Sequence, residues 1–436
     1  MGHITNGNIY RKLGRKIDSL SMRAPWTQTL YEILKELYTE EEASFVVQMP
    51  YSLSGFRKIK RVTGYEKKKL HRILDRLCAK GLVMDLKIRG SYYYMPSPIV
   101  IGVFEFSMMR TGDSQGIKKR AELFHTYLQG EDAFQNRNFN GNNNISFMRT
   151  LPHEETVIPA DYTEILDYEK ASALIQEADR FSIGICSCRH EKLHLGEKEC
   201  DVPLDTCSSF GMAADFLIRN NLAKEVDKAE MLDNLARSKE MGLVLNADNV
   251  QRKITYICHC CGCCCNVLLG ISKYGYSDII VTSNFIAEVD ESMCKGCGKC
   301  ADSCHINVIR MLPSDDINGG RKIPSVDESL CLGCGVCVLS CNTGAIRLVR
   351  RSHRVITPET TFERIILQCL EKGTLQYQIF DNPSDVTQRI MRTFLGAFLR
   401  LPPVKKALLS DLFRSSFLDF MKRGSNKQGK SWLTEI

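Results

Sequence analysis

The sequence has 436 residues, 20 of them cysteine, and its 58 basic and 51 acidic residues give a net charge of +7. A chain of this length exceeds one ordinary hydrophobic core, so we expect several domains. The mild charge excess does not by itself indicate nucleic-acid binding. So many cysteines indicate either disulfides in an oxidising compartment or metal ligands in a reducing one.

The distribution of other residues favours the reducing compartment. Residues 1–20 lack the apolar segment of a secretory signal, and no apolar run approaches the roughly 18 residues of a membrane-spanning helix. We therefore expect a cytoplasmic protein whose thiols bind metal. Cys78 and Cys369 stand apart from the other cysteines and are predicted to be ordinary core residues.

Residues 1–96 are predicted to form three helices followed by a β-hairpin. Apolar residues at helical spacing mark 30–37 and 70–77, with a short helix at 54–61 between them and a hairpin turn near Arg89. This order resembles the winged helix-turn-helix family, which implies either DNA binding or protein docking. The basic residues expected to meet DNA phosphates are Arg57, Lys58, Lys60, Arg61, Lys67, Lys68, Arg72 and Arg76.

The next two segments are predicted to be a helical connector and an α/β domain. Residues 97–150 read as the connector, with an Asn-rich loop at 136–144. Residues 151–283 alternate short strands and helices. Within them, 181–185 is predicted to be a buried strand and 208–220 a helix.

The C-terminal residues 351–436 are predicted to be a helical tail. Thr357 is the expected N-cap, with Pro358 at the first helical position, and the helices should reach about Lys422. Apolar stripes flanked by basic residues are expected to pack against the protein or a partner subunit. Peripheral contact with an acidic membrane surface is the alternative.

Two segments align without gaps, VDESMCKGCGKCADSCHINVIRM from Val289 and VDESLCLGCGVCVLSCNTGAIRL from Val326. Each contains C-x2-C-x2-C-x3-C. Three thiolates on a tight, glycine-containing loop reach three corners of one cubane, and the fourth, expected to open a helix, ligates the cluster of the other repeat. One cluster is assigned to Cys294, Cys297, Cys300 and Cys341, and the other to Cys331, Cys334, Cys337 and Cys304.

The alternative for this repeat is a pair of zinc sites, but zinc motifs usually present two C-x2-C pairs. Residues 284–350 resemble a bacterial two-cluster ferredoxin. They depart from it at His305 and Asn342, where that family usually has proline. The resemblance implies a domain with two [4Fe–4S] clusters that pass single electrons at low potential.

Two further cysteine groups precede the repeat. The first contains Cys186, Cys188, Cys200 and Cys207. An iron–sulfur cluster, a zinc site and a redox-active thiol pair are all open for it. A helix start near Ser208 and the side chain of Arg189 are expected to offset negative charge there.

The second group contains Cys258, Cys260, Cys261, Cys263, Cys264 and Cys265. Six thiols exceed the needs of one tetrahedral site or one cubane. Some of them are expected to complete the site of the first group and others to form a separate site, and which thiols share a metal stays open. His259 is expected to be a bystander or a hydrogen-bond donor to sulfur.

The motifs ICSCRH and ICHCCGCCC together with the dicluster repeat resemble a family of long 4Fe–4S dicluster proteins of anaerobic bacteria, over most of residues 95–350. The resemblance implies iron–sulfur electron transfer. We thus expect a multidomain α+β protein that relays electrons to a partner oxidoreductase. A redox-sensing DNA-binding regulator and an oxidoreductase subunit with a substrate-reducing cluster are the alternatives. No Walker loop or dinucleotide fingerprint is present in the sequence.

Overall fold

The computed structural model describes residues 6–111, 114–139, 145–157, 166–313, 321–352, 355 and 357–436. The chain divides into two compact units. The first consists of Met1–Asn140, Met212–Lys224 and Glu359–Ile436, and the second of Gly141–Gly211 and Glu225–Pro358. The predicted head falls in the first unit with most of the predicted tail, from Glu359 onward, and the predicted dicluster segment falls in the second. The predicted cysteine-rich domain, 151–283, lies in the second unit except for residues 212–224, which belong to the first. The protein is multidomain and mixes helices with several small sheets.

The first unit begins with helices and a small antiparallel sheet. These elements are α1 (Asn6–Asp18), α2 (Gln28–Leu37), α3 (Glu40–Gln48), β1 (Ser54–Gly55), α4 (Phe56–Thr63), α5 (Lys67–Ala79), β2 (Val83–Ile88) and β3 (Ser91–Pro96). Positive φ angles of 50° at Arg89 and 78° at Gly90 make the tight turn between β2 and β3. The predicted helices and hairpin are present, but α1 and α3 were not foreseen. The winged-helix resemblance stays a prediction.

Acidic side chains bind two of the eight basic residues expected to contact DNA. Arg76 lies 3.1 Å from Glu41 and 2.8 Å from Glu42, and Lys58 pairs with Asp381. The other six remain exposed on α4 and α5. Their positive charge is therefore available at the surface, and DNA binding stays a prediction.

The connector and the tail complete the first unit. The connector contains η1 (Ile99–Val103), α6 (Phe104–Met108), α7 (Ser114–His125), η2 (Thr126–Gly130) and α8 (Asp132–Phe139), and the inserted segment forms α11 (Gly211–Arg219). The tail contains α16 (Thr361–Lys372), α17 (Leu375–Ile379), α18 (Val386–Leu399), α19 (Pro402–Leu409), α20 (Asp411–Lys427) and η6 (Ser431–Glu435). Residues 136–139 are thus helical rather than part of the predicted Asn-rich loop, whose residues 140–144 lie outside the described ranges.

The helical tail starts later than predicted. Thr360, not Thr357, is the N-cap of α16, and its hydroxyl accepts a hydrogen bond from the N–H of Glu363. Gln251 explains the difference, because its side chain donates to the carbonyl of Thr357 and its N–H to that of Pro358. The carbonyl groups of Thr357 and Pro358 therefore accept hydrogen bonds from Gln251 and do not take part in the first turn of a helix.

An apolar stripe on α18 is exposed rather than packed within the chain. Val386, Ile390 and Phe394 follow one another at four-residue spacing and are 57%, 51% and 70% exposed. The opposite face of α18 buries Arg392, whose guanidinium donates to backbone carbonyls. Packing of the stripe against a partner subunit stays a prediction. Among the described helices, none is both long and apolar enough to cross a membrane.

The second unit contains a six-stranded sheet of order β4-β8-β9-β6-β5-β7. Its strands are β4 (Met148–Leu151), β5 (Phe181–Ile185), β6 (Asp205–Phe210), β7 (Ala223–Val226), β8 (Val244–Asp248) and β9 (Tyr256–Cys260). Its helices are α9 (Ala171–Glu177), α10 (Ser187–Leu195), α12 (Lys228–Glu240) and α13 (Asn266–Tyr274), with η3 (Glu154–Thr156), η4 (Asp167–Glu169) and η5 (Ser277–Ile279) as short turns. An apolar core that includes Phe181, Phe210 and Met231 joins the sheet to α9 and α12.

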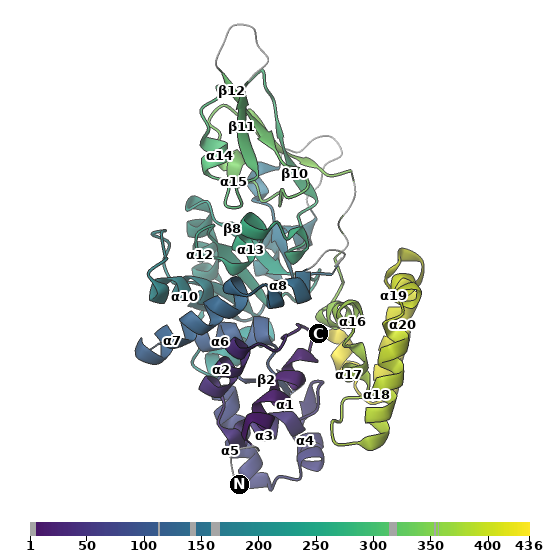
Figure 1. The fold of residues 1–436 in the computed structure, drawn as a ribbon. Coiled ribbons are helices and arrows are strands. Elements are labelled where there is room, and N and C mark those ends of the chain that lie inside the picture. Colours follow the sequence, from purple (N-terminus) through teal and green to yellow (C-terminus); the bar gives the residue numbers. More distant parts are fainter. Residues whose placement is uncertain are drawn as a thin grey trace. The chain divides into compact units, whose positions relative to one another are not determined.

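The duplicated segments gather at one end of the second unit (Figure 1). They form β10 (Phe285–Val289), α14 (Lys299–Asp302), β11 (Ile309–Pro313), β12 (Lys322–Val326), α15 (Val336–Leu339) and β13 (Ile346–Arg350). Strand β10 pairs with β13 and β11 with β12, both antiparallel. Each pair therefore joins the start of one repeat to the end of the other.

Asp381 joins the tail to the head within the first unit. Its carboxylate accepts hydrogen bonds from Ser52 and Lys58, and Lys430 lies 3.5 Å away. Burial acts to raise the pKa of Asp381, but Lys430 and Lys58 outweigh it and lower the pKa below its ordinary value. The carboxylate therefore stabilises the unit above the ordinary pKa of aspartate, and this contribution disappears as the pH falls through the lowered pKa.

We expect Asp381→Asn to lower the free energy of unfolding of this unit by about 2 kcal/mol at neutral pH, because it weakens charge-assisted hydrogen bonds. Guanidinium unfolding of anaerobically prepared protein, followed by circular dichroism, measures the change. The control is Asp419→Asn at an exposed position on α20, which should change the free energy by less than about 0.5 kcal/mol. Equal effects of the two variants would contradict the role of Asp381.

Candidate metal centres

The loops of the duplicated segment place Cys331, Cys334 and Cys337 of the second repeat close together and, in the first repeat, Cys294 near Cys300. Cys300 lies within α14 and Cys337 within α15, and the fourth cysteines, Cys304 and Cys341, follow the ends of these short helices. The expectation that the fourth cysteine opens a helix is therefore wrong. The helix begins earlier because a glycine with positive φ stands directly before each one.

The fourth cysteine of each repeat lies beside the thiols of the other repeat. Cys341 is close enough to Cys300 to act on its pKa electrostatically, as Cys304 does on Cys334 and Cys337. A cavity in the second half has Cys304, Cys331, Cys334 and Cys337 in its lining. This is the placement that crossed coordination requires, and the donor set fits a [4Fe–4S] cluster. The assignment of each ligand stays a prediction.

Two glycines of the second loop have both positive φ and close neighbours. Gly333 has φ +66°, and a Cβ atom there would lie 2.0 Å from the carbonyl oxygen of Phe285. Gly335 has φ +85°, and its Cβ would lie 2.2 Å from Oγ1 of Thr156. No other residue type fits these positions without a shift of the neighbouring backbone or side chain. The loop therefore curls tightly, as the sequence predicted.

The two halves of the duplicated segment differ in their exposure. In the first, Cys297 is exposed, and exposed Lys295 and Lys299 lie on either side of it in the sequence. The corresponding residues of the second repeat, Leu332 and Val336, are each only 3% exposed. The first loop therefore faces solvent, whereas the second is packed inside the unit.

Burial and hydrogen bonding act differently on the pKa values of two thiols of the second repeat, Cys334 and Cys341. Burial raises the pKa of Cys334 to about 12, so this thiol requires a metal to become a thiolate at neutral pH. At Cys341 burial also acts to raise the pKa, but hydrogen bonds from the Thr343 hydroxyl and from nearby backbone N–H groups outweigh it and lower the pKa. These donors favour a thiolate at Cys341.

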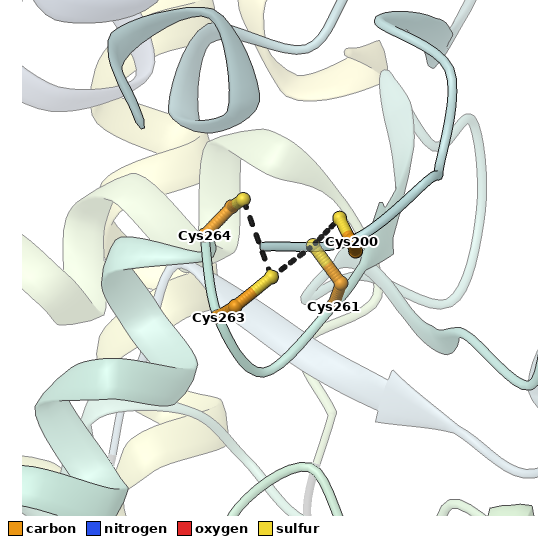
Figure 2. Close-up of side chains that lie close together, drawn as sticks. All are labelled: Cys200, Cys261, Cys263 and Cys264. Atoms are coloured by element: carbon orange, nitrogen blue, oxygen red, sulfur yellow. Dashed lines mark hydrogen bonds between the residues drawn. The ribbon is translucent and has the colours of Figure 1, made fainter. Parts of the chain in front are cut away.

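The ten cysteines of the two middle groups are arranged differently from the sequence grouping. Cys200, which the sequence places in the first group, lies beside Cys261, Cys263 and Cys264 of the second, and all four sulfur atoms lie within 4.8 Å of one another. Figure 2 shows these side chains pointing toward one another from two loops. We call them the four-thiol site. The sequence could not have revealed it, because 60 residues separate Cys200 from Cys261 along the chain.

The remaining thiols form a second group, here called the six-thiol group. Its members in order of contact are Cys186, Cys188, Cys265, Cys260, Cys258 and Cys207. The sheet explains part of this order. Ser208 is opposite Ile257 in the antiparallel pairing of β6 with β9, which brings the preceding Cys207 beside Cys258. Hydrogen bonds from Cys258 and Cys265 lower the pKa of Cys260 to about 5.

The polar surroundings of the six-thiol group differ from the expected ones. Ser208 lies in β6 and does not start a helix, because residues 205–210 pair with β5 and β9, and α11 begins only at Gly211. The helices that begin at this group are α10 and α13, whose N-caps are Cys186 and Cys265. Their N-terminal N–H groups are placed to offset negative charge on sulfur.

Arg189 and His259 take clearly defined positions beside the thiols. Arg189 is completely buried and donates to Thr206 and to the carbonyl of His259. The pKa of Cys261 is lowered to about 4, chiefly by a hydrogen bond with Cys264 and in addition by the positive charge of Arg189. The His259 ring is hydrogen-bonded to Ser208 at 2.8 Å rather than to sulfur, which the sequence had left open. Burial lowers its pKa to about 3, so the ring is neutral.

His305 joins the duplicated segment to the loop of the four-thiol site. Its Nδ1 accepts a hydrogen bond of 3.1 Å from the N–H of Gly262, and its Nε2 lies 2.8 Å from the carbonyl oxygen of Gly242. The ring therefore carries its proton on Nε2. His305 follows Cys304 and stands where the ferredoxin family usually has proline. A proline ring could make neither hydrogen bond.

Comparison with known proteins supports an iron–sulfur protein. The family model of the 4Fe-4S dicluster domain matches residues 293–345, which include all eight cysteines of the repeat. Searches of the curated proteins and of the solved structures find no significant match. The chain therefore carries a 4Fe–4S dicluster domain, which confirms the predicted iron–sulfur chemistry and indicates electron transfer.

Gly335 and its counterpart Gly298 allow a test of the loop geometry. Alanine at either position has to adopt a positive φ, at a cost of about 1–2 kcal/mol. Only at Gly335 does the added Cβ also clash, whereas no atom lies within 4 Å of the corresponding position at Gly298. We expect Gly335→Ala to shorten the half-life of the visible cluster absorbance on mild heating several-fold more than Gly298→Ala. Equal half-lives would contradict the packing of the second loop.

Proposed function

We propose that this protein relays single electrons through two [4Fe–4S] clusters to a partner oxidoreductase. The single observation that carries the proposal is the placement of Cys304 and Cys341, each beside the thiols of the other repeat. The proposed ligands of the first cluster are Cys294, Cys297, Cys300 and Cys341, and those of the second are Cys331, Cys334, Cys337 and Cys304. A cluster bound there supplies reversible one-electron transfer with little rearrangement.

The protein surroundings support a relay rather than a chemical reaction at these loops. Buried thiols, tight glycine turns and N–H donors toward sulfur hold a cluster rigidly and set its potential. The contact between α14 and α15 brings the third cysteines of both repeats, Cys300 and Cys337, close enough to interact electrostatically. Two clusters bound to these loops would therefore be neighbours, which favours transfer between them.

The difference between the two halves supports an order for the relay. The first cluster would lie beneath the exposed Cys297 with its two lysines, so we propose that the partner exchanges electrons there and presents an acidic surface. The second would lie in the buried half, where His305 contacts Gly262 of the cysteine-rich segment. Electrons would thus pass between the surface and the interior of the second unit.

Double alanine substitutions test the crossed ligands. If Cys297 and Cys341 serve the same cluster, Cys297→Ala combined with Cys341→Ala should lose about four irons per chain, as each single variant does. The matched control combines Cys297→Ala with Cys304→Ala, which should lose about eight because both clusters are affected. Iron analysis and electron paramagnetic resonance of anaerobically purified protein give the counts. Loss of both clusters in the first pair, or a protein that contains only zinc, would contradict the proposal.

A second candidate function is reduction of a substrate at the six-thiol group. The supporting observation is that six thiols contact one another in series, two more than one cubane uses. Catalysis at iron requires a cluster with an exchangeable coordination position. Cyanide or carbon monoxide added to the reduced protein should then change its paramagnetic resonance spectrum, and a spectrum unaffected by both would exclude this candidate.

A further inference from the structure

We propose that Cys200, Cys261, Cys263 and Cys264 together bind one thiophilic metal ion in tetrahedral geometry, zinc or iron, and not a cubane cluster. The sulfur atoms of Cys200 and Cys261 are 3.6 Å apart, those of Cys261 and Cys263 3.8 Å, and those of Cys263 and Cys264 3.4 Å. Four thiolates at bonds of 2.3 Å around a single ion stand about 3.8 Å from one another. The observed separations fit that tetrahedron.

A cubane places a different iron behind each thiolate, so its four ligand sulfurs have to stand farther apart than those around a single ion. The duplicated segment provides an internal comparison. Within the described part of the chain, the sulfurs of the four-thiol site all lie within 4.8 Å of one another, and no group of three or more cysteines from the dicluster repeat meets this limit. The four thiols are therefore closer together than those of the repeat.

The two loops that carry the site are positioned by contacts outside it. Three of the thiols come from the turn after β9, and at its centre the N–H of Gly262 donates to His305. A Cβ atom on Gly262 would lie 2.7 Å from the carbonyl oxygen of His305, so the turn fits closely against this residue. Cys200 comes from the loop after α10, where Lys198 donates to its carbonyl oxygen.

The surroundings suit an ion with four thiolate ligands. Val202 and Leu243 are buried against the cysteines, of which Cys261 and Cys264 are buried and Cys200 and Cys263 partly exposed. Four thiolates around a divalent ion leave two negative charges, which have to be offset in such surroundings. The buried guanidinium of Arg189 is close enough to Cys261 to interact with it electrostatically, and Lys198 supplies a second cation.

Zinc and iron both accept four thiolates tetrahedrally, and they would give the site different roles. Zinc would cross-link the loop after α10 to the turn after β9. Iron would add a one-electron carrier directly beside His305 and therefore beside the second half of the duplicated segment. The proposal does not depend on cluster binding to the dicluster domain, because it rests on other cysteines.

Metal analysis of the full chain tests the proposal. In anaerobically purified protein, Cys263→Ala should lose about one metal ion per chain, zinc or iron, and keep the rest of its iron. The control Cys369→Ala removes a buried thiol outside both groups and should lose none. Loss of about four irons from Cys263→Ala would show a cubane and overturn the proposal, as would an unchanged metal content.

X-ray absorption of the unsubstituted protein provides a measurement that does not depend on the folding of a variant. A zinc edge with four sulfur neighbours and no metal neighbour identifies the zinc form. For the iron form, the ferric ion of the oxidised protein should give a high-spin signal in electron paramagnetic resonance that Cys200→Ala also abolishes. Absence of both signatures overturns the proposal, whereas the spectra of the dicluster domain report separately on the relay.

Discussion

The exchange of segments between the two repeats is the constraint on which the second unit depends. Strand β10 pairs with β13, and β11 pairs with β12, so that neither repeat forms a sheet by itself. The same exchange brings Cys304 and Cys341 to the opposite halves. Asp290 and Asp327 show how closely the repeats match, because each accepts hydrogen bonds of 3.0 and 2.6 Å from the serine two residues later. Backbone pairing and thiol placement thus follow from one duplicated design.

The two repeats have the same backbone plan but different surroundings. Lys295 and Lys299 of the first loop correspond to Leu332 and Val336 of the second, and the first pair is exposed whereas the second pair is buried. A difference in burial acts on cluster potential and on access by a partner at the same time. The surroundings also differ at the residue after the fourth cysteine, because His305 of the first repeat contacts Gly262 of the neighbouring cysteine-rich segment. Of the two departures from the ferredoxin pattern, His305 therefore lies at an interior contact of that segment, whereas Asn342 is exposed.

Local features of the chain could be predicted from the sequence, because they depend on neighbouring residues. The spacing of the repeat, the positive-φ glycines and the helical periodicity of 70–77 are of this kind. Features that depend on distant residues could not. Cys200 meets Cys261 only because the sheet and α10 bring their loops together, and Thr357 loses its role as N-cap to a contact with Gln251. The segment 208–220 was predicted to be helical, and α11 covers residues 211–219 of it, but its first three residues belong to strand β6.

The division of the chain has a consequence for biosynthesis. The first unit is discontinuous, since its last segment begins only at Glu359. Every cysteine of the four-thiol site, the six-thiol group and the duplicated segment precedes that residue. During translation all these thiols emerge before the first unit can be completed, although domains generally fold from the N-terminus onward. The cysteine-rich segments of the nascent chain are therefore made before the segment that completes the first unit.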